Sequence, residues 1–266
     1  MPELPEVEAV RRRLEKALKG RRIARVEAPP DPIVLDGTSP ERLVSVLRGR
    51  RVEAVRRKGK HFFFALDRRP WPLFHFGMTG WFHVDREDRD PPRRFTRLRL
   101  EIEGGTRVVF TDPRRFGRIR LSQDPLGEPP LSKLGFDVLD ELPTAAVLAH
   151  LVARRKAPLK AVLLDQSLFA GIGNWIADEV LYQARLSPLR LAASLGLDEV
   201  KTLRARLHGV VKRAVDVGAD SDRFPRHWLF HDRWGRMRDA RTARGEAIVH
   251  DTVGGRTTAW VPAVQK

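Results

Sequence analysis

The chain has 266 residues, of which 42% are hydrophobic and none is cysteine, so it can form one large or two modest domains without disulfides or cysteine-based metal sites. Its 50 Lys and Arg against 34 Asp and Glu give a formal charge of +16, which favours a polyanionic partner such as nucleic acid. An anionic membrane surface is the main alternative, but the sequence has neither a basic amphipathic helix with bulky aromatics nor a run of the ~18 apolar residues that a membrane span requires.

The first predicted element is an amphipathic helix at the N-terminus. Carboxylates at Glu3, Glu6 and Glu8 suit its first turn, where they complement the positive end of the helix dipole, and Gly20 is a natural stop. Its apolar residues recur at spacings of three and four, at Val7, Val10, Leu14 and Leu18. An acidic start of this kind is not a signal peptide, so we expect a location in the bacterial cytoplasm or nucleoid.

Helix formation does not explain Pro2. A small residue in second position normally allows removal of the initiator methionine, and the mature chain would then begin with the secondary amine of a proline. A free α-amine has a pKa of about 7.7–8.0, far below that of lysine, so a good fraction is neutral and nucleophilic near neutral pH. Because Glu3 follows directly, the meaning of this pair depends on the rest of the chain.

Short segments rich in β-branched and aromatic residues come next and predict strands. Turn-forming Pro, Gly and Asp residues separate them. The segments are residues 21–28, 50–57, 61–67, 81–85, 97–104, 107–112 and 118–122. Together they predict a β-sandwich or barrel of about 100 residues behind one helix.

The character of the sequence changes across residues 124–143, which are rich in Pro, Gly and Asp. Helical patterns follow at residues 144–155, 159–166, 174–185 and 197–218. Residues 245–262 are typical of a β-hairpin closed by a Gly-Gly turn. We therefore predict an α+β protein with two domains, in which a β-sandwich domain with a leading helix at 1–130 and a linker at 131–141 precede a helical domain at 142–266.

Two glycine-bracketed loops could place apolar side chains at the surface. HFGMTG carries Met78, and DPRRFG carries Arg114, Arg115 and Phe116. Basic residues around an exposed apolar side chain are what a protein needs to neutralise phosphates and insert a wedge between bases. Alternatively, Met78 is a core residue, and Asp112 forms a local ion pair with Arg114.

Two further segments suit phosphate binding. Lys58 and Lys60 precede a predicted strand, where they are either a solvated turn or phosphate contacts. In LLDQSLFAGIGNWIADEV, Gly171 and Gly173 allow a tight double turn, and Asn174 could cap the helix that follows. Bare backbone amides at such a helix start would make an anion site that suits a DNA phosphate.

The motifs MPELPEVE, RRKGKHFFF, HFGMTG, TDPRRFG and LDQSLFAGIGNWIADEVL occur in this order along the chain. With them the sequence resembles the formamidopyrimidine-DNA glycosylase and endonuclease VIII family of bifunctional base-excision enzymes, over roughly residues 2–260. The PEL form of the N-terminus is closer to the formamidopyrimidine branch. The resemblance implies that the β-sandwich domain is catalytic and that the second domain is a helix-two-turn-helix DNA-binding domain with a finger at about 230–266.

The resemblance also implies a role for each matching residue. Pro2 would attack C1′ of a damaged nucleotide and form a Schiff base, after which β- and δ-elimination cut the strand. Glu3 matches the general acid/base, Glu6 a supporting carboxylate, and Lys60 a lysine that contacts phosphate beside the lesion. Met78, Arg114 and Phe116 would fill the hole left by the flipped nucleotide. The other DNA contacts would be Arg115, Asn174 and Arg256, the last two to phosphate.

Family members usually end in a zinc finger with four cysteines, and here this sequence departs from the family. The ligand positions align with Arg241, Arg244, Val261 and Val264, none of which could bind zinc there. The resemblance therefore implies a zincless finger, as in plant, fungal and some animal relatives, with Trp260 and the two valines packing in place of the metal. We expect catalysis to need no metal or organic cofactor.

Residues 218–230 replace a longer glycine-rich loop that closes over 8-oxoguanine in bacterial relatives. The resemblance thus implies a preference for hydantoins, formamidopyrimidines and abasic sites, with weaker activity on 8-oxoguanine. The expected partner is double-stranded DNA with oxidised bases or abasic sites, bound by a monomer and without a membrane. A protein that binds damaged DNA without cutting it would not need Pro2 and Glu3, and an RNA-binding protein would not explain MPELPEVE.

Overall fold

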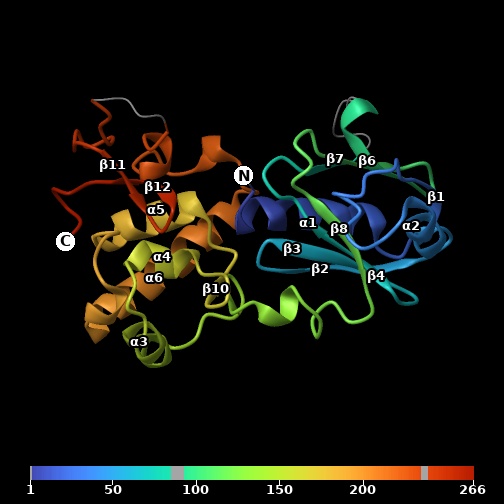
Figure 1. The fold of residues 1–266 in the computed structure, drawn as a ribbon. Helices are drawn as coiled ribbons and strands as arrows, with labels where there is room; N and C mark the ends of the chain where they lie inside the picture. Colours follow the sequence, from blue (N-terminus) through green and yellow to red (C-terminus); the bar gives the residue numbers. More distant parts are fainter. Residues whose placement is uncertain (1, 85–92, 235–238) are drawn as a thin grey trace. The chain divides into compact units, whose positions relative to one another are not determined.

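The computed structural model of the chain describes residues 2–84, 93–234 and 239–266 (Figure 1). It consists of two compact units. The N-terminal unit contains Pro2 and residues 6–133, and the C-terminal unit contains residues 3–5 and 134–266. Asp85 of a predicted strand and residues 235–238 of the predicted finger lie outside the described residues.

The N-terminal unit is the β-sandwich with a leading helix that the sequence predicts. One antiparallel sheet has the strand order β1–β6–β7–β5, formed by Ile23–Glu27, Thr96–Ile102, Arg107–Thr111 and Trp81–Val84. The other has the order β2–β3–β4–β8, formed by Val52–Lys58, His61–Leu66, Trp71–His75 and Arg118–Ser122. Helix α1 spans Leu4–Leu18 and helix α2 spans Pro40–Leu47.

Aromatic side chains from both sheets form the core of this unit. Phe82 of β5 lies with its ring centroid 5.2 Å from Phe74 of β4 and 5.8 Å from Phe62 of β3. All three rings are fully buried, and buried aromatic pairs of this kind stabilise a core through both area and ring geometry. The predicted apolar side of α1 joins the same core through Val7, Val10, Leu14 and Leu18. The spacing of the apolar residues in the sequence therefore predicts correctly which face of α1 is buried.

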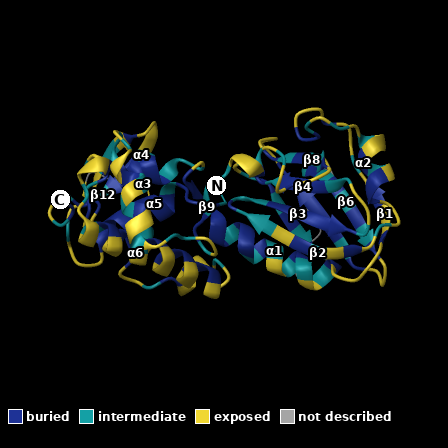
Figure 2. Ribbon diagram, turned by 90° about the horizontal axis from the view of Figure 1, so that it is seen from below, coloured by how far each residue is buried: buried dark blue, intermediate teal, exposed yellow. Residues whose placement is uncertain are grey.

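The C-terminal unit is helical and ends in a two-stranded hairpin. Its helices are α3 (Ala145–Ala153), α4 (Leu159–Leu164), α5 (Asn174–Ala184) and α6 (Leu197–Asp216). Its strands are the parallel pair β9 (Phe136–Asp137) and β10 (Phe169–Ala170), and the hairpin β11 (Val249–Val253) and β12 (Arg256–Trp260). Helix α5 is buried on nearly every side, as its dark blue colour in Figure 2 shows.

Five short 3₁₀ helices complete the described secondary structure, at Arg93–Phe95, Leu131–Lys133, Ala192–Ser194, Ser221–Arg223 and Leu229–His231. The predicted apolar face of α6 is buried. Its residues are Val200, Leu203, Leu207, Val210 and Ala214, with Val217 just after the helix. No helix in the described part of the chain is long and apolar enough to cross a membrane.

Two elements of the N-terminal unit are missing from the sequence-based prediction. Strand β4 contains Pro72, and a proline inside a strand normally argues for a turn. Pro72 lies near the start of the strand, where β4 pairs with β8 through Leu121 but not yet with β3, whose pairing covers Leu73–His75. Helix α2 has a recognisable start, in which Ser39 caps the helix and Pro40 occupies its first turn.

Candidate active site and nucleic-acid interface

The start of the chain joins the C-terminal unit through Glu3. Pro2 is half-buried, whereas Glu3 exposes 2% of its surface. The Glu3 carboxylate accepts hydrogen bonds from the backbone N–H groups of Gly173 (2.8 Å), Trp175 (2.9 Å) and Ile176 (3.3 Å). These N–H groups lie at the start of α5 and have no partner within the helix. A carboxylate from the start of the chain therefore caps α5. Met1 lies outside the described residues, so its removal stays a prediction.

This contact corrects two predictions about the start of α5. The N-cap residue is Gly173, and Asn174 is already the first residue of the helix, so Asn174 does not cap it. The first amides of the helix do make an anion site, but the anion that they bind is the Glu3 carboxylate rather than a DNA phosphate. The three donors lie at the positive end of the helix dipole, where a carboxylate is a favourable partner.

The glycines of the double turn make room for the start of the chain. A Cβ on Gly173 would lie 2.2 Å from Cδ of Glu3. At Gly171 φ is +105°, and a Cβ there would lie 2.4 Å from Cδ1 of Leu4. The backbone N–H of Leu4 also donates to the carbonyl oxygen of Gly171 at 3.2 Å. The glycine pattern around α5 is therefore explained by close packing of residues 3 and 4.

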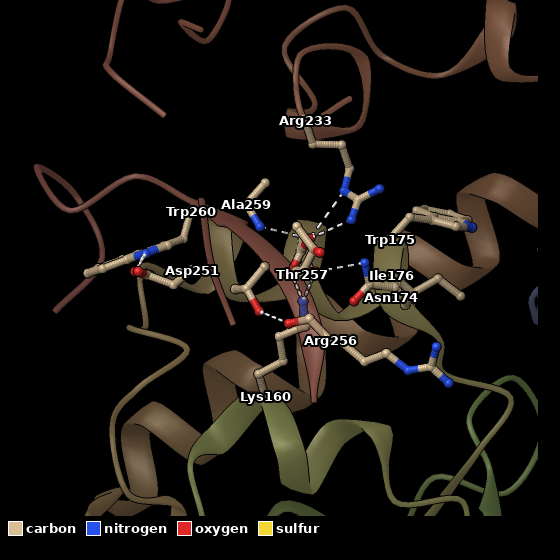
Figure 3. Close-up of polar contacts among 12 residues, drawn as sticks. Lys160, Asn174, Trp175, Ile176, Arg233, Asp251, Arg256, Thr257, Ala259 and Trp260 are labelled. Atoms are coloured by element: carbon tan, nitrogen blue, oxygen red, sulfur yellow. Dashed lines mark hydrogen bonds and ion pairs between the residues drawn. The ribbon is translucent and has the colours of Figure 1, made fainter. Parts of the chain in front are cut away.

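Asn174 contacts the C-terminal hairpin instead. Its Nδ2 donates to the carbonyl oxygen of Thr257 at 2.9 Å, and its Oδ1 is buried without a hydrogen-bond partner (Figure 3). Arg256, the residue before Thr257, is exposed at the start of β12. The structure thus brings together Asn174 and Arg256, the two residues predicted to contact phosphate, in one part of the C-terminal unit.

The loops that carry Met78 and Phe116 pack against each other in the N-terminal unit. Gly77 has φ of +60°, and a Cβ there would lie 2.4 Å from the carbonyl carbon of Phe116. Met78 is 40% exposed and Phe116 is 45% exposed, so the alternative that Met78 is a core residue is wrong. The Arg114 guanidinium lies 4.9 Å from the centre of the Phe116 ring, a cation–π distance.

Asp112 joins these two loops. Its buried carboxylate accepts hydrogen bonds from the Thr79 hydroxyl (2.6 Å) and from the backbone N–H groups of Gly117 (2.6 Å) and Arg114 (3.3 Å). Asp112 therefore binds the backbone of Arg114, while the Arg114 guanidinium stacks on Phe116. The three residues predicted to fill the hole beside a flipped nucleotide, Met78, Arg114 and Phe116, are held on one pair of cross-linked loops.

Arg115 differs from its neighbour because it is engaged within the protein. Its Nε and Nη2 donate to the two oxygens of Asp31, each at 2.9 Å. Burial opposes ionisation of Asp31, but the hydrogen bonds from Arg115 and Val34 outweigh it and lower the pKa of that carboxyl; the same pair raises the pKa of Arg115. The structure assigns Arg115 to loop support, and a direct DNA contact by Arg115 remains a prediction.

Two other predicted site residues, Glu6 and Lys60, belong to the N-terminal unit. Glu6 is half-buried in the first turn of α1, and Lys60 lies in the two-residue turn between β2 and β3. The rings of His61 and His75, 4.5 Å apart, lie near Lys60. Burial lowers the pKa of His61 to about 3 and that of His75 to about 4, with a contribution from the Lys60 charge. Both rings are thus neutral at pH 7, and the sequence predicts no role for either histidine.

The hairpin is packed in part as the sequence predicts. Val261 is fully buried, and Val264 packs against the same small core. Trp260 is half-buried, and its Nε1 donates to Asp251 Oδ2 across the hairpin at 2.8 Å. Sequence reasoning missed a buried ion network beneath β12, formed by Lys160, Asp178 and Arg233. Among the described residues no cluster of His, Asp or Glu is arranged to hold a metal ion.

A β-sandwich unit with a leading helix and a helix-two-turn-helix unit with a terminal hairpin define a class of two-domain nucleic-acid enzymes. The family model for the formamidopyrimidine-DNA glycosylase N-terminal domain matches residues 1–119, and the model for the H2TH domain of the same enzymes matches residues 134–225. The chain belongs to the formamidopyrimidine-DNA glycosylase family.

Individual relatives agree with this assignment. A formamidopyrimidine-DNA glycosylase of Arabidopsis thaliana is 40% identical, over 100% of this chain and 71% of that protein. A solved structure of the Lactococcus lactis enzyme, non-covalently bound to DNA containing an AP site, superimposes with a TM-score of 0.86 at 26% identity and covers 100% of both chains. Another, with DNA containing FAPY-dG, has a TM-score of 0.85 at 25% identity and covers 99% of this chain and 100% of that one.

Proposed function

We propose that this DNA glycosylase of base excision repair is bifunctional: it removes oxidised bases from double-stranded DNA and then cuts the strand through a Schiff base on Pro2. The observation that carries the proposal is the fixed position of Glu3, whose carboxylate accepts three backbone hydrogen bonds. Because these hydrogen bonds restrain Glu3, they also limit the positions open to the amine of the residue directly before it. Restricting a nucleophile in this way lowers the entropic part of the barrier.

In the proposed reaction, removal of Met1 leaves Pro2 with a free secondary amine. The amine attacks C1′ of the damaged nucleotide, the bond from C1′ to the base breaks, and the sugar ring opens to an iminium ion. This iminium keeps its positive charge without a proton, so it accepts the electrons released when the strand is cleaved by elimination. Glu3 follows Pro2 directly in the chain and transfers protons during ring opening, a contribution of typically 10²–10⁴-fold.

The proposed DNA contacts fall into two groups. Lys60, Arg256 and the Asn174 amide bind phosphates, which gives affinity that does not depend on sequence. Met78 and Phe116, both exposed, enter the base stack where the damaged nucleotide leaves it. The proposal that DNA is the partner is supported by the net charge of +16 and by the Lactococcus lactis relatives, whose structures contain an AP site and FAPY-dG.

Borohydride trapping on abasic-site DNA tests the proposed nucleophile. Borohydride reduces the iminium to a stable amine, so the processed protein should become covalently attached to the DNA. The matched control is the same protein with an uncleaved N-terminal tag, which blocks the amine and should prevent the adduct. An adduct of equal yield with the tagged protein would show that another group is the nucleophile, and no adduct with a correctly processed N-terminus would favour a protein that binds damage without cutting.

We also propose that hydantoins, formamidopyrimidines and abasic sites are better substrates than 8-oxoguanine. The support is the short segment 218–230, which contains one 3₁₀ turn at Ser221–Arg223 and the start of another at Leu229–His231. A short loop provides little surface with which to enclose an extruded purine. Single-turnover excision rates on matched duplexes carrying each lesion would measure the ranking, and a faster rate on 8-oxoguanine than on the other lesions would reverse it.

A further inference from the structure

Three ionised side chains lie buried together beneath the C-terminal hairpin. Lys160 of α4 places its Nζ 2.6 Å from Asp178 Oδ1, and Arg233 donates through Nη2 (2.6 Å) and Nε (3.2 Å) to Asp178 Oδ2. The Lys160 and Asp178 side chains are fully buried, and that of Arg233 is 6% exposed. Removing three charges from water is unfavourable unless each is paired and hydrogen-bonded. Such a network in the middle of a small unit therefore calls for a function.

Two members of this network, Lys160 and Asp178, bond to the backbone of β12. Lys160 Nζ donates to the carbonyl oxygen of Thr257 at 3.1 Å, and the backbone N–H of Ala259 donates to Asp178 Oδ2 at 3.2 Å (Figure 3). Among the residues that the structure describes, β12 pairs with β11 alone, so its other edge carries N–H and C=O groups that must bond elsewhere. The ion network supplies those partners and fixes the register of the strand against α4 and α5.

The carbonyl oxygen of Thr257 has a second donor. Asn174 Nδ2 reaches it at 2.9 Å, so one backbone oxygen is shared between the buried ammonium of Lys160 and the amide at the start of α5. Arg256 is the residue directly before this oxygen. Any shift of β12 therefore changes the distance between Arg256 and Asn174, and the network opposes such a shift.

We propose that Lys160, Asp178 and Arg233 are positioning residues that do for this cysteine-free hairpin what a bound metal does in a zinc finger: they hold β12 so that Arg256 and Asn174 face the same DNA backbone. The proposal rests on the proposed function of Arg256 and Asn174 as phosphate contacts. It goes beyond packing by apolar residues, because a hydrophobic core opposes unfolding but does not fix the register of a strand edge as hydrogen bonds at Thr257 and Ala259 do.

A double-mutant cycle between Lys160→Met and Arg256→Ala tests the proposal. Each single variant should weaken binding to an abasic-site duplex by about tenfold and lower the salt slope of binding by ~1. Arg256→Ala removes the charged phosphate contact itself, and Lys160→Met moves Arg256 out of position for it. The double variant should be about tenfold weaker in total rather than a hundredfold, since Arg256 without its network has no contact left to lose. Independent effects that multiply to about a hundredfold would overturn the proposal, as would unchanged affinity in Lys160→Met.

Two controls separate positioning from folding and from the chemistry. Lys201→Met removes an exposed lysine that pairs with Asp198 on α6, and it should leave both affinity and the effect of Arg256→Ala unchanged. Circular dichroism and thermal unfolding show whether Lys160→Met folds; if it does not, Arg233→Lys, which keeps the charge but loses one of the two bonds to Asp178, takes its place in the same cycle.

Borohydride trapping at saturating DNA completes the design. A folded network variant should still form the adduct, because the Pro2 amine does not depend on β12. Loss of trapping in the unmodified protein would count against the proposed function alone, whereas an additive cycle with normal trapping would count against the network alone.

Discussion

Glu3 combines a structural and a chemical task in one carboxylate. It is buried against three N–H groups of α5, which gives it a fixed position and a stabilised negative charge. A free carboxylate on a chain terminus would sample many positions and would seldom lie beside the amine at the moment of reaction. At the scale of single residues, the cap of α5 is therefore part of the proposed catalytic arrangement.

Gly173→Ala tests this coupling, because the added Cβ would lie 2.2 Å from Cδ of Glu3. The carboxylate must move away from the amides of α5, so we expect base excision to fall by at least about 10²-fold, the lower end of what a general acid/base contributes. Gly209→Ala on α6 is the matched control, because a Cβ there meets nothing within 4 Å. This control should stabilise the helix by ~0.5–1 kcal/mol and leave excision unchanged. Equal excision rates for the two variants would show that the position of the Glu3 carboxylate does not affect base excision.

The sequence singles out Glu3 and Asn174 as candidate site residues but does not predict their partners in the structure. MPELPEVE and GIGNWIADE marked both segments as unusual, yet the contact between them spans 170 residues. A hydrogen bond between residues so far apart produces neither a periodic pattern nor a local bias in composition, so a single sequence gives no signal of it. For the same reason Asn174 was assigned to capping, a local role, rather than to its contact with Thr257, 83 residues away.

At the scale of elements, α5 is the centre of the C-terminal unit. Its start binds Glu3, Asp178 belongs to the ion network, and Glu179 is completely buried. Glu179 accepts hydrogen bonds from Gln183 Nε2 (2.7 Å) and from the backbone N–H of Phe230 (2.8 Å). One helix thus organises the proposed catalytic carboxylate, the support of the hairpin and the chain after α6.

The burial of Glu179 predicts an unusual pH dependence of stability. Burial raises the pKa of this carboxyl from 4.5 to about 7, although its hydrogen bonds oppose the shift. Between these two values the folded protein binds more protons than the unfolded chain, so this group makes the folded state less stable as the pH rises, by at most ~1.4 kcal/mol per pH unit. The dependence from this group ends about one pH unit above 7, where the carboxyl is ionised in both states.

Urea unfolding of the full chain between pH 4.5 and 8 measures this effect, with Glu179→Gln as the comparison. The variant cannot titrate, so its free energy of unfolding should change less with pH over the interval from 4.5 to 7. Its stability at any single pH is not the test, because an amide has one acceptor oxygen where the carboxylate uses two. Parallel pH profiles for the two proteins would show that Glu179 is ionised in the folded state throughout.

At the scale of the whole molecule, the order of the motifs and the change from strand to helix patterns predict the two kinds of unit well. The period of α1 and α6 and the alternation of the strands are dictated by which faces are buried, so they can be read from the sequence. Strand β4 was missed because Pro72 is typical of turns, and the ion network was missed because Lys160, Asp178 and Arg233 belong to no local pattern. The formation of β4 and of the ion network depends on packing between distant segments rather than on any local preference of the sequence.

The net charge of +16 leads to a prediction about recognition by the whole protein. Contacts to phosphate release counterions, so the affinity should fall as salt rises, with a log–log slope of ~0.9 per neutralised phosphate. These contacts are the same on damaged and undamaged duplexes, whereas the wedge at Met78 and Phe116 and the everted nucleotide involve no charge. We therefore expect the two duplexes to show equal slopes from ~50 to ~200 mM salt, with a constant ratio between their dissociation constants. Fluorescence anisotropy with an abasic-site duplex and its undamaged counterpart measures both slopes, and a damage preference that disappears as salt rises would mean that charge, rather than base eversion, discriminates the lesion.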